Sequence, residues 1–487
     1  MVCANSFVTK IHLLDDSFER RSSVYWVMAV FAVGFYFAAR AIGVMLFNPD
    51  SWFYIEMSET VFNGDFYRFH TNRSYFSTEY SAAFPPGYPV ALALARVVFG
   101  GATLTSGVLN ICAAAATVYA LFKICGLLNF HGLARLAVAC ALLLYPQYMD
   151  ELFAGKAMPL AVLFFVFSFY ALLTKRVFLS GVLLGGSALV RFDFLVYALC
   201  FQCAVFVLNR KPKDALLSFC GVLLGIAPWV VYSFTRFGEF WVSDNSWVAV
   251  SAMKAYVLDY PAAPAVSALV NPGLWLARLF GNIPPLVKSV FSSSAGFPLL
   301  YVFLAASLFK WRALLPGAKN KLLLICLFVV LSLFPYLLTG YYDKRYFALV
   351  FLVLSVAFIY TAREAKLHLS GFAVLGLLLT FYGGGAYLTD TLARAADYSK
   401  YKLPAENRRI AELLACHQKH PDHTLIFSAD TLYLTAWYGL TTGMKAASLP
   451  TNFERMTDLE KQFYFESMRP YLKVSKTSVG DDECLIN

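Results

Sequence analysis

Charged residues are scarce in this sequence. Asp, Glu, Lys and Arg make up only 14% of the 487 residues, whereas hydrophobic residues make up 59%. A soluble domain carries about 25% charged residues, so the composition excludes a series of ordinary soluble domains and indicates a chain mostly surrounded by lipid. The net charge of +10 would suit a nucleic-acid partner, but the basic residues lie between apolar segments. We therefore interpret the charge as the positive-inside bias of cytoplasmic loops and expect no nucleic-acid partner.

The sequence also shows no removable signal peptide, no internal repeat and no low-complexity tract. Residues 1–23 are mixed polar and typical of a cytoplasmic tail. The first apolar segment, 24–47, is longer than the core of a signal peptide, which has about 7–15 residues. We expect this segment to remain in the protein as its first membrane span.

Long apolar segments are abundant instead. Clusters of Lys and Arg separate them, and if every cluster is cytoplasmic, the segments alternate in direction without contradiction. The predicted fold class is a polytopic α-helical membrane protein with about 11 transmembrane helices, a cytoplasmic N-terminus and an extracytoplasmic C-terminus. The predicted spans are 24–47, 103–123, 133–149, 157–174, 177–191, 193–209, 214–235, 296–311, 321–340, 345–362 and 368–389.

One apolar segment, 87–100, breaks this alternation. It has 14 residues, whereas a span needs about 20, so it is more typical of an interfacial helix. We therefore assign 48–102 to a first external loop that contains interfacial helices, and 236–295 to a second large external loop. With the spans, these loops form a transmembrane domain over 24–389.

The composition changes again near the end of the chain. The tail, 390–487, predicts a small extracytoplasmic α/β module, with an amphipathic helix at 405–420, a buried strand at 424–428 and a second, short helix. Cys416 and Cys484 are the cysteines of this module. Because an outer compartment can be oxidising, we predict a disulfide between them.

Asp50 opens the first external loop and is the leading candidate for chemistry. Other outer turns also carry charges, namely Asp150-Glu151, Arg191-Asp193 and Lys344-Arg345. Such a set suits transfer of a group carried on a phosphate, because a carboxylate can take the proton of an acceptor hydroxyl and basic groups can hold the leaving phosphate. The alternative role for Asp50 is the N-cap of a helix that begins at Ser51.

The residues around Asp50 leave alternatives open. Arg40, within the first span, either extends to the interface or pairs with the external carboxylates. Glu56 and Glu59 suit a solvated helix face better than a catalytic role. Tyr54 suits an interfacial aromatic belt or a wall for a lipid chain.

Several short motifs follow one another along nearly the whole chain. They are Arg40 followed by Asp50-Ser-Trp-Phe-Tyr54, Pro85-Pro86-Gly87-Tyr88-Pro89 ahead of Phe99-Gly100, Leu109-Asn110, Arg191, Pro228-Trp229 ahead of Phe237-Gly238-Glu-Phe-Trp241, Arg345-Tyr346 and Ala436-Trp437-Tyr438-Gly439. Their order resembles that of GT-C glycosyltransferases of the family 39-like group, which includes protein O-mannosyltransferases and lipid A aminoarabinose transferases.

The sequence departs from this group at three places. Ser51 stands where many relatives have a second acid, and Phe192 stands where they have a proline. For the family acid of the second external loop, Asp150 and Glu151 are the candidates, and the alternative is that Lys156 occupies the aligned position.

The resemblance implies a GT-C fold in the cytoplasmic (inner) membrane and a specific reaction on its outer face. A hexosyl or pentosyl group would move, with inversion, from a polyprenyl-phosphate donor to a hydroxyl of lipid A, of O-antigen or another envelope glycan, or of a protein. Asp50 would be the base, and Lys344, Arg345 and Arg191 would bind the donor phosphate. The supporting residues would be Arg40, Tyr54, Glu79, Tyr88, Asp150, Glu151 and Tyr342.

The resemblance also bears on cofactors and on competing functions. The enzymes that this sequence resembles need no metal, so we expect none here. The alternative is a divalent ion held by Asp50 with Asp150 or Glu151, as several acids hold one in the oligosaccharyltransferase branch. The main alternative function is a transporter or flippase for a lipid-linked sugar. Transporters tend to show inverted repeats and broken helices at mid-membrane, whereas this chain gathers its charges at the outer ends of its helices.

Overall fold

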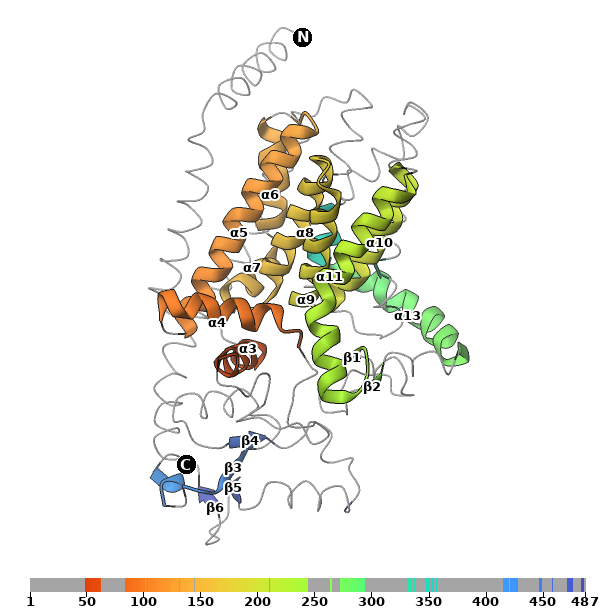
Figure 1. Ribbon diagram of the computed structural model, residues 1–487. Helices are drawn as coiled ribbons and strands as arrows, with labels where there is room; N and C mark the ends of the chain where they lie inside the picture. Colours follow the sequence, from red (N-terminus) through yellow and green to blue (C-terminus); the bar gives the residue numbers. More distant parts are fainter. Residues whose placement is uncertain are drawn as a thin grey trace.

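Figure 1 shows the computed structural model of the chain. It describes residues 49–62, 84–100, 102–130, 132–143, 145–209, 211–243, 263–264, 272–293, 332–333, 337, 347–350, 352–353, 356, 415–419, 421–427, 446–448, 458, 471–475 and 483–485. The predicted spans 24–47, 296–311 and 368–389 lie outside the described residues, and 321–340 and 345–362 lie mostly outside them.

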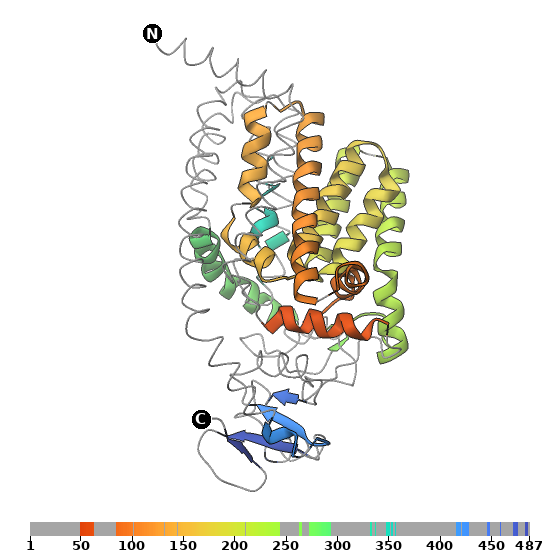
Figure 2. The same cartoon turned by 90° about the vertical axis from the view of Figure 1, so that its left-hand side faces the viewer.

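Apolar helices packed side by side form the main body (Figures 1 and 2). They are α5 (Ala102–Leu127), α6 (Gly132–Leu143), α7 (Pro146–Phe153), α8 (Met158–Leu173), α9 (Val177–Val190), α10 (Asp193–Asn209) and α11 (Pro212–Phe237). Among the described helices, α5 and α11 are each long and apolar enough to cross a membrane. The pair α7 and α8 passes the same test together, as a broken span or re-entrant loop bent by 115°. The chain is thus an integral membrane protein.

Glycines bring α9 and α11 into backbone contact. Gly181 and Gly185 on α9 face Gly221 and Gly225 on α11, and a Cβ atom added to Gly185 would lie 2.4 Å from the carbonyl oxygen of Val222. Helices in membranes associate through such pairs of small residues four positions apart, because the backbones can approach closely. This contact fixes the position of the turn that follows α9.

Two helices lie across one end of the bundle, as Figures 1 and 2 show from two sides. They are α3 (Pro49–Thr60) and α4 (Gly87–Phe99). α4 covers the segment expected to be an interfacial helix, and it buries Tyr88 and Leu92 while its second half exposes Val97 and Val98. A short amphipathic helix of this kind suits the membrane interface. The turns between α5 and α6, α8 and α9, and α10 and α11 all lie at the opposite end of the bundle.

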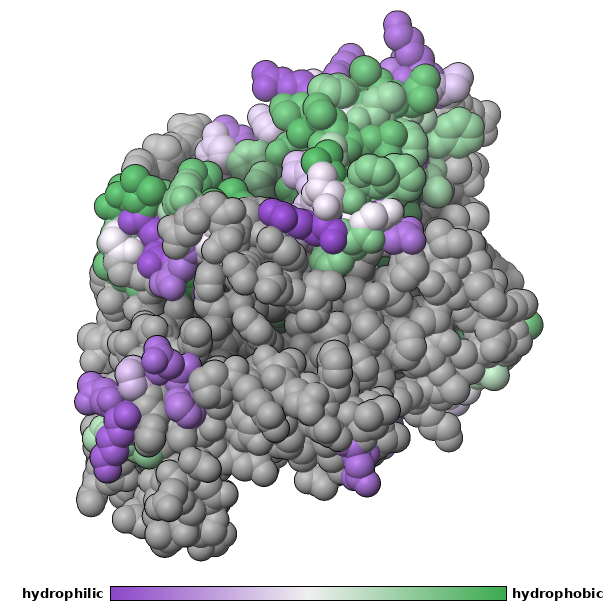
Figure 3. Space-filling model, turned by 60° about the horizontal axis from the view of Figure 1, so that its bottom comes forward, coloured by the Kyte–Doolittle hydropathy of each residue, from purple (hydrophilic) through white to green (hydrophobic). Residues whose placement is uncertain are grey.

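The polar and apolar surfaces follow this division. Figure 3 shows that apolar residues gather over the described helical bundle. Hydrophilic residues lie mainly at the margins of this apolar area and away from it. On α11, the exposed residues include Leu216, Leu224 and Val231. Apolar residues on the outside of a bundle are what a lipid environment favours.

The remaining described elements follow the bundle in sequence. β1 (Val242–Ser243) and β2 (Ala263–Pro264) form a short antiparallel pair within the predicted second external loop, and α13 (Pro272–Ser293) follows them. α13 contains Pro284 and Pro285, and Asn282 donates a hydrogen bond to the carbonyl oxygen of Leu337 at 2.7 Å.

The tail forms a parallel sheet near the end of the bundle that carries α3 and α4 (Figures 1 and 2). Its strands are β3 (Thr424–Phe427), β4 (Ala446–Ser448), β5 (Tyr471–Ser475) and β6 (Glu483–Leu485), in the spatial order β4-β3-β5-β6. Leu425 lies opposite Ala446 on one side and Leu472 on the other, and it is fully buried. The predicted strand at 424–428 is thereby confirmed, whereas most of the predicted helix at 405–420 lies outside the described residues.

The predicted disulfide is supported at one of its two cysteines. Cys416 is disulfide-bonded and follows the start of the short helical turn at 415–417. Cys484 lies in β6, an edge strand of the sheet. Pairing of Cys416 with Cys484 itself remains a prediction.

Candidate functional site

The candidate site is built around the turn between α7 and α8. Pro146 begins α7, and α7 ends at Phe153. Gly155 has a φ of 68°, a left-handed conformation that glycine adopts readily, and it lets the chain bend into α8. The backbone N–H of Lys156 donates to the carbonyl oxygen of Glu151 at 3.1 Å and closes the turn.

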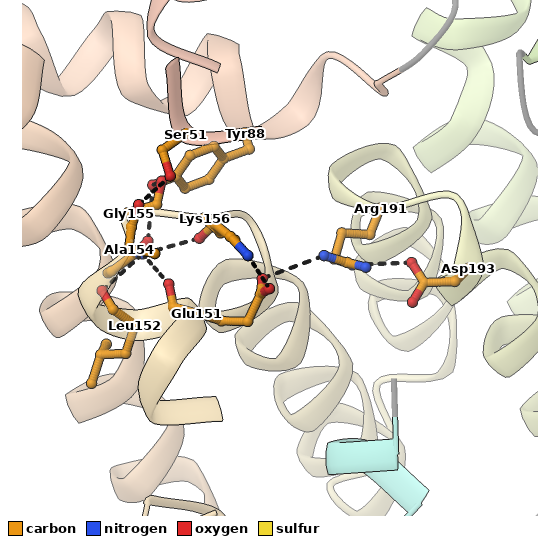
Figure 4. Close-up of polar contacts among 10 residues, drawn as sticks. Ser51, Tyr88, Glu151, Leu152, Ala154, Gly155, Lys156, Arg191 and Asp193 are labelled. Carbon is orange, nitrogen blue, oxygen red and sulfur yellow. Dashed lines mark hydrogen bonds and ion pairs between the residues drawn. The ribbon is translucent and has the colours of Figure 1, made fainter. Parts of the chain in front are cut away.

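Three side chains from three different helices hold this turn (Figure 4). Ser51 of α3 donates its hydroxyl hydrogen to the carbonyl oxygen of Ala154. The hydroxyl of Tyr88, on α4, donates to the carbonyl oxygen of Gly155 at 2.9 Å. The amide nitrogen of Asn110, on α5, donates to the carbonyl oxygen of Lys156 at 3.0 Å.

Tyr88 and Asn110 also contact each other, and Asn110 lies near the last carbonyls of α7. Asn110 Nδ2 also lies 3.4 Å from the carbonyl oxygens of both Glu151 and Leu152, and its Oδ1 lies 3.1 Å from the hydroxyl of Tyr88. The last carbonyls of a helix have no partner within the helix and need one elsewhere. We call Ser51, Tyr88 and Asn110 the turn clamp, because together they bind consecutive carbonyls of the turn.

The turn clamp explains two of the motifs. Tyr88 belongs to Pro85-Pro86-Gly87-Tyr88-Pro89, and Asn110 to Leu109-Asn110. Gly87 packs so closely on the end of α9 that a Cβ atom there would lie 2.6 Å from the carbonyl oxygen of Leu189. A glycine at this position therefore allows α4 to approach the helix that carries Arg191.

A chain of alternating charges extends from the turn to the end of α9 (Figure 4). Lys156 Nζ lies 3.1 Å from Glu151 Oε1, and Glu151 Oε2 lies 3.5 Å from Arg191 Nη1. Arg191 Nε donates to Asp193 Oδ1 at 3.1 Å. The side chains of Glu151 and Lys156 are 1% and 5% exposed. Removing Glu151 would leave the buried ammonium of Lys156 without its ion-pair partner, a change that costs about 3–5 kcal/mol.

Asp50 adjoins this arrangement through the backbone. It is the second residue of α3, and the neighbouring Ser51 is bound to Ala154. The side chain of Asp50 lies outside what the structure describes. Because α3 begins at Pro49, Asp50 lies in its first turn rather than ahead of a helix beginning at Ser51. A carboxylate in the first turn still interacts favourably with the helix dipole.

Several predicted roles near Asp50 are corrected by the structure. Tyr54 is 4% exposed and its ring packs against those of Phe84 and Tyr88, each at 4.9 Å between centroids, so it is neither in an aromatic belt nor in a lipid-facing wall. Glu56 is 2% exposed, so the solvated helix face was wrong for this residue. Glu59 is exposed and pairs with Arg96 of α4 at 3.1 Å, as a solvated position allows.

The predicted phosphate-binding residues differ in what the structure shows of them. Arg191 directs Nε to Asp193 and Nη1 to Glu151, so much of its guanidinium is already engaged. Asp150 is half-buried in α7, one residue before Glu151, and its carbonyl accepts the N–H of Ala154. The predicted site residues that lie outside the described residues are Arg40, Glu79, Tyr342, Lys344 and Arg345.

Lys156 received no site role in the sequence analysis. The signal for it was present, since Lys156 was a candidate for the aligned position of the family acid and directly precedes the predicted span 157–174. The alternative metal site of Asp50 with Asp150 or Glu151 stays a prediction, because the side chain of Asp50 lies outside the described residues. The part of the chain that the structure describes contains no group of three or more metal-ligating side chains, and Glu151 is engaged by two cations. We derive no step through a metal.

Comparison with known proteins supports the fold. No protein-family model matches the chain, and no curated protein sequence matches it. Among solved structures, the chain is similar to the crystal structure of ArnT from Cupriavidus metallidurans bound to undecaprenyl phosphate, with a TM-score of 0.54 and 14% sequence identity. The similarity covers 94% of this chain and 87% of that chain. The chain therefore has the GT-C fold of a polytopic helical membrane protein, as the order of its motifs predicted.

Proposed function

We propose that this protein is a membrane glycosyltransferase that moves a sugar from a polyprenyl-phosphate donor to a hydroxyl acceptor. The observation that carries the proposal is the buried charge chain Lys156–Glu151–Arg191–Asp193 at one end of an apolar bundle. Ionisable groups at membrane depth are expensive and usually serve a function. The fold supports the same proposal, because a protein of similar fold was crystallised with undecaprenyl phosphate.

The proposed reaction is an inverting displacement at the outer face of the cytoplasmic membrane. The acceptor oxygen attacks the anomeric carbon, and the bond from that carbon to the phosphate oxygen breaks. The phosphate keeps the electron pair, and the hydroxyl proton passes to Asp50 as general base. Basic residues at the site, with Lys344 and Arg345 as the leading candidates, offset the charge that develops on the phosphate. The products are the glycoside and the polyprenyl phosphate.

The acceptor classes that suit an outer-face enzyme are lipid A, O-antigen or another envelope glycan, and protein. A hexosyl and a pentosyl donor are both compatible with the proposed reaction. Comparison of the glycans in membranes with and without the protein would identify the acceptor, because only the true product disappears with the enzyme.

Turnover by the purified protein tests the proposal against a transporter or flippase. The full chain, purified in lipid nanodiscs, is incubated with a panel of undecaprenyl-phosphate sugars and with membrane extract as the source of acceptor. We expect one donor to be consumed, with release of undecaprenyl phosphate and formation of a new glycosidic bond. A protein that moves intact donor across proteoliposomes and releases no undecaprenyl phosphate would contradict the proposal and favour the transporter.

Replacing Arg345 with lysine tests the proposed phosphate contact. An interfacial anchor tolerates lysine in place of arginine, whereas a bidentate contact of a guanidinium with a phosphate does not. We expect the apparent KM for the donor to rise by about tenfold or more, because a charge-assisted hydrogen bond is lost, while the expression level stays normal. Steady-state kinetics with the consumed donor provide the measurement. Arg363→Lys, at a basic loop predicted to be cytoplasmic, is the control, and equal kinetics for both variants would leave anchoring as the role of Arg345.

A further inference from the structure

The ammonium group of Lys156 has more donors than the chain uses. A lysine ammonium carries three N–H donors. In the part of the chain that the structure describes, Glu151 is the residue that accepts from Lys156 Nζ. The side chain is only 5% exposed, so bulk water reaches little of it. A buried N–H without an acceptor is costly, and the oxygens of a phosphate would supply acceptors for the remaining N–H groups.

The position of Lys156 is fixed before any ligand arrives. Its backbone N–H donates to Glu151 and its carbonyl accepts from Asn110, while the carbonyls of the two preceding residues accept from Ser51 and Tyr88. Because the backbone is held on both sides and Nζ is held by Glu151, a ligand bound here would lose little free energy to ordering of the protein.

The helix that follows adds a second feature that favours an anion. α8 begins at Met158, two residues after Lys156, and no side chain caps its N-terminus. The first N–H groups of a helix have no partner within the helix, and its dipole makes this end positive. Lys156 directly precedes Ala157, the N-cap of this 16-residue helix, so a cationic residue adjoins the positive helix end in the sequence. Both features attract phosphate more strongly than they attract a neutral water molecule.

We propose that Lys156, with the uncapped N-terminus of α8, binds the phosphate group of the polyprenyl-phosphate donor. This inference rests on the proposed function and adds a binding residue that the family motifs do not supply. Glu151 holds the ammonium in place, and Arg191 balances the second oxygen of Glu151 from the other side. Tyr88 and Asn110 of the turn clamp are positioning residues, because they hold the backbone at Gly155 and Lys156 and do not themselves bind the phosphate.

Binding of undecaprenyl phosphate, without a sugar, separates this inference from the proposed function. The full chain in nanodiscs is titrated with undecaprenyl phosphate, and Kd is compared between wild type and Lys156→Met. We expect Kd to rise by about 10–100-fold, because a charge-assisted hydrogen bond to the phosphate is lost. Lys156→Arg keeps the charge and is expected to recover most of the affinity.

A charge-balanced double variant controls for folding. Lys156→Met alone removes one partner of Glu151, so its effect could reflect instability. Glu151→Gln with Lys156→Met removes one charge of each sign and leaves Arg191 paired with Asp193. We expect this double variant to keep a Tm near that of wild type and still to show the increased Kd. Wild-type affinity in a folded double variant would overturn the inference and leave the proposed function intact.

A measurement on the unaltered protein covers the case in which both variants unfold. Undecaprenyl phosphate with a photoreactive group at its phosphate end is crosslinked to wild type, and the labelled peptide is identified by mass spectrometry. Labelling within 154–158 that excess undecaprenyl phosphate suppresses would support the inference. Saturable labelling confined to other segments would overturn it. A wild-type protein that neither binds undecaprenyl phosphate nor turns over any donor contradicts the proposed function itself.

Discussion

Gly185→Ala protein is expected to be destabilised by about 3 kcal/mol or more, enough to lose most of its folded yield. The added methyl group would lie 2.4 Å from the carbonyl oxygen of Val222 and 2.7 Å from the Cα of Gly225. Both atoms belong to the backbone of α11, so neither can turn aside as a flexible side chain can. α9 must move away from α11, and the contacts on both sides of the glycine pair are lost.

The neighbouring residue is a matched control for this change. A Cβ atom at Gly186 would meet only the ring of Phe164, at 3.8 Å, which is an ordinary van der Waals distance. Alanine is also preferred over glycine in a helix by about 0.5–1 kcal/mol. Gly186→Ala is therefore expected to match or slightly exceed the stability of wild type. Thermal unfolding in detergent compares the variants, and equal Tm values for Gly185→Ala and Gly186→Ala would contradict the close contact of α9 with α11.

The movement of α9 has a consequence for the site. Arg191 directly follows the last residue of α9 and pairs with Glu151 on α7. Any Gly185→Ala protein that remains folded should therefore bind undecaprenyl phosphate more weakly, since the network that holds Lys156 would be displaced.

Much of the bundle could be predicted from the sequence because the apolar runs are long and basic turns separate them. The predicted spans 157–174, 177–191 and 193–209 match α8, α9 and α10 to within two residues at each end. The predicted span 133–149 is different, because the structure ends α6 at Leu143 and begins α7 at Pro146. The residue before a proline disfavours the helical conformation, so Pro146 was the signal for this break, and hydropathy alone could not detect it.

The site was harder to predict, because its contacts join residues distant in sequence. Tyr88 and Gly155 are separated by 67 positions, and Asn110 and Lys156 by 46. Motif order singled out Tyr88 and Asn110 without indicating what they bind. The sequence analysis expected Arg191 to bind the donor phosphate. The structure pairs Arg191 with Glu151 of α7 and with Asp193, and its role toward the donor stays a prediction. Such pairing depends on how helices pack, which the linear pattern of charges does not specify.

Asp50→Asn protein is expected to fold and to turn over the donor about 10²–10⁴-fold more slowly than wild type. This factor is the typical contribution of a general base. Asparagine keeps the size of aspartate but cannot accept the proton of the attacking hydroxyl. Asp50 lies in the first turn of α3, so loss of its charge removes a helix-dipole interaction of about 0.3–1 kcal/mol. The variant should thus show a slightly lower Tm and a far lower rate.

Glu59→Gln provides the control on the same helix. Glu59 is exposed, with 42% of its side chain accessible, and its partner is Arg96 on α4. An exposed ion pair contributes about 0.2–1 kcal/mol, so Glu59→Gln should lower Tm about as much as Asp50→Asn does. Its turnover should stay near that of wild type, because this side chain faces solvent. Comparing the two variants separates the effect on Tm of losing a carboxylate from α3 from the effect on turnover of losing the general base.

Single-turnover transfer with saturating undecaprenyl-phosphate sugar is the decisive measurement. Saturation removes any contribution of donor affinity, so a slow rate reports the chemical step. If Asp50 bound the donor instead, the defect would lie mainly in KM and would vanish at saturation. If Asp50 only stabilised the first turn of α3, the transfer rate would stay within a few-fold of wild type while Tm fell, as expected for Glu59→Gln. Either result would move the base assignment to another carboxylate, and Glu56, buried on the same helix, would be the next to replace.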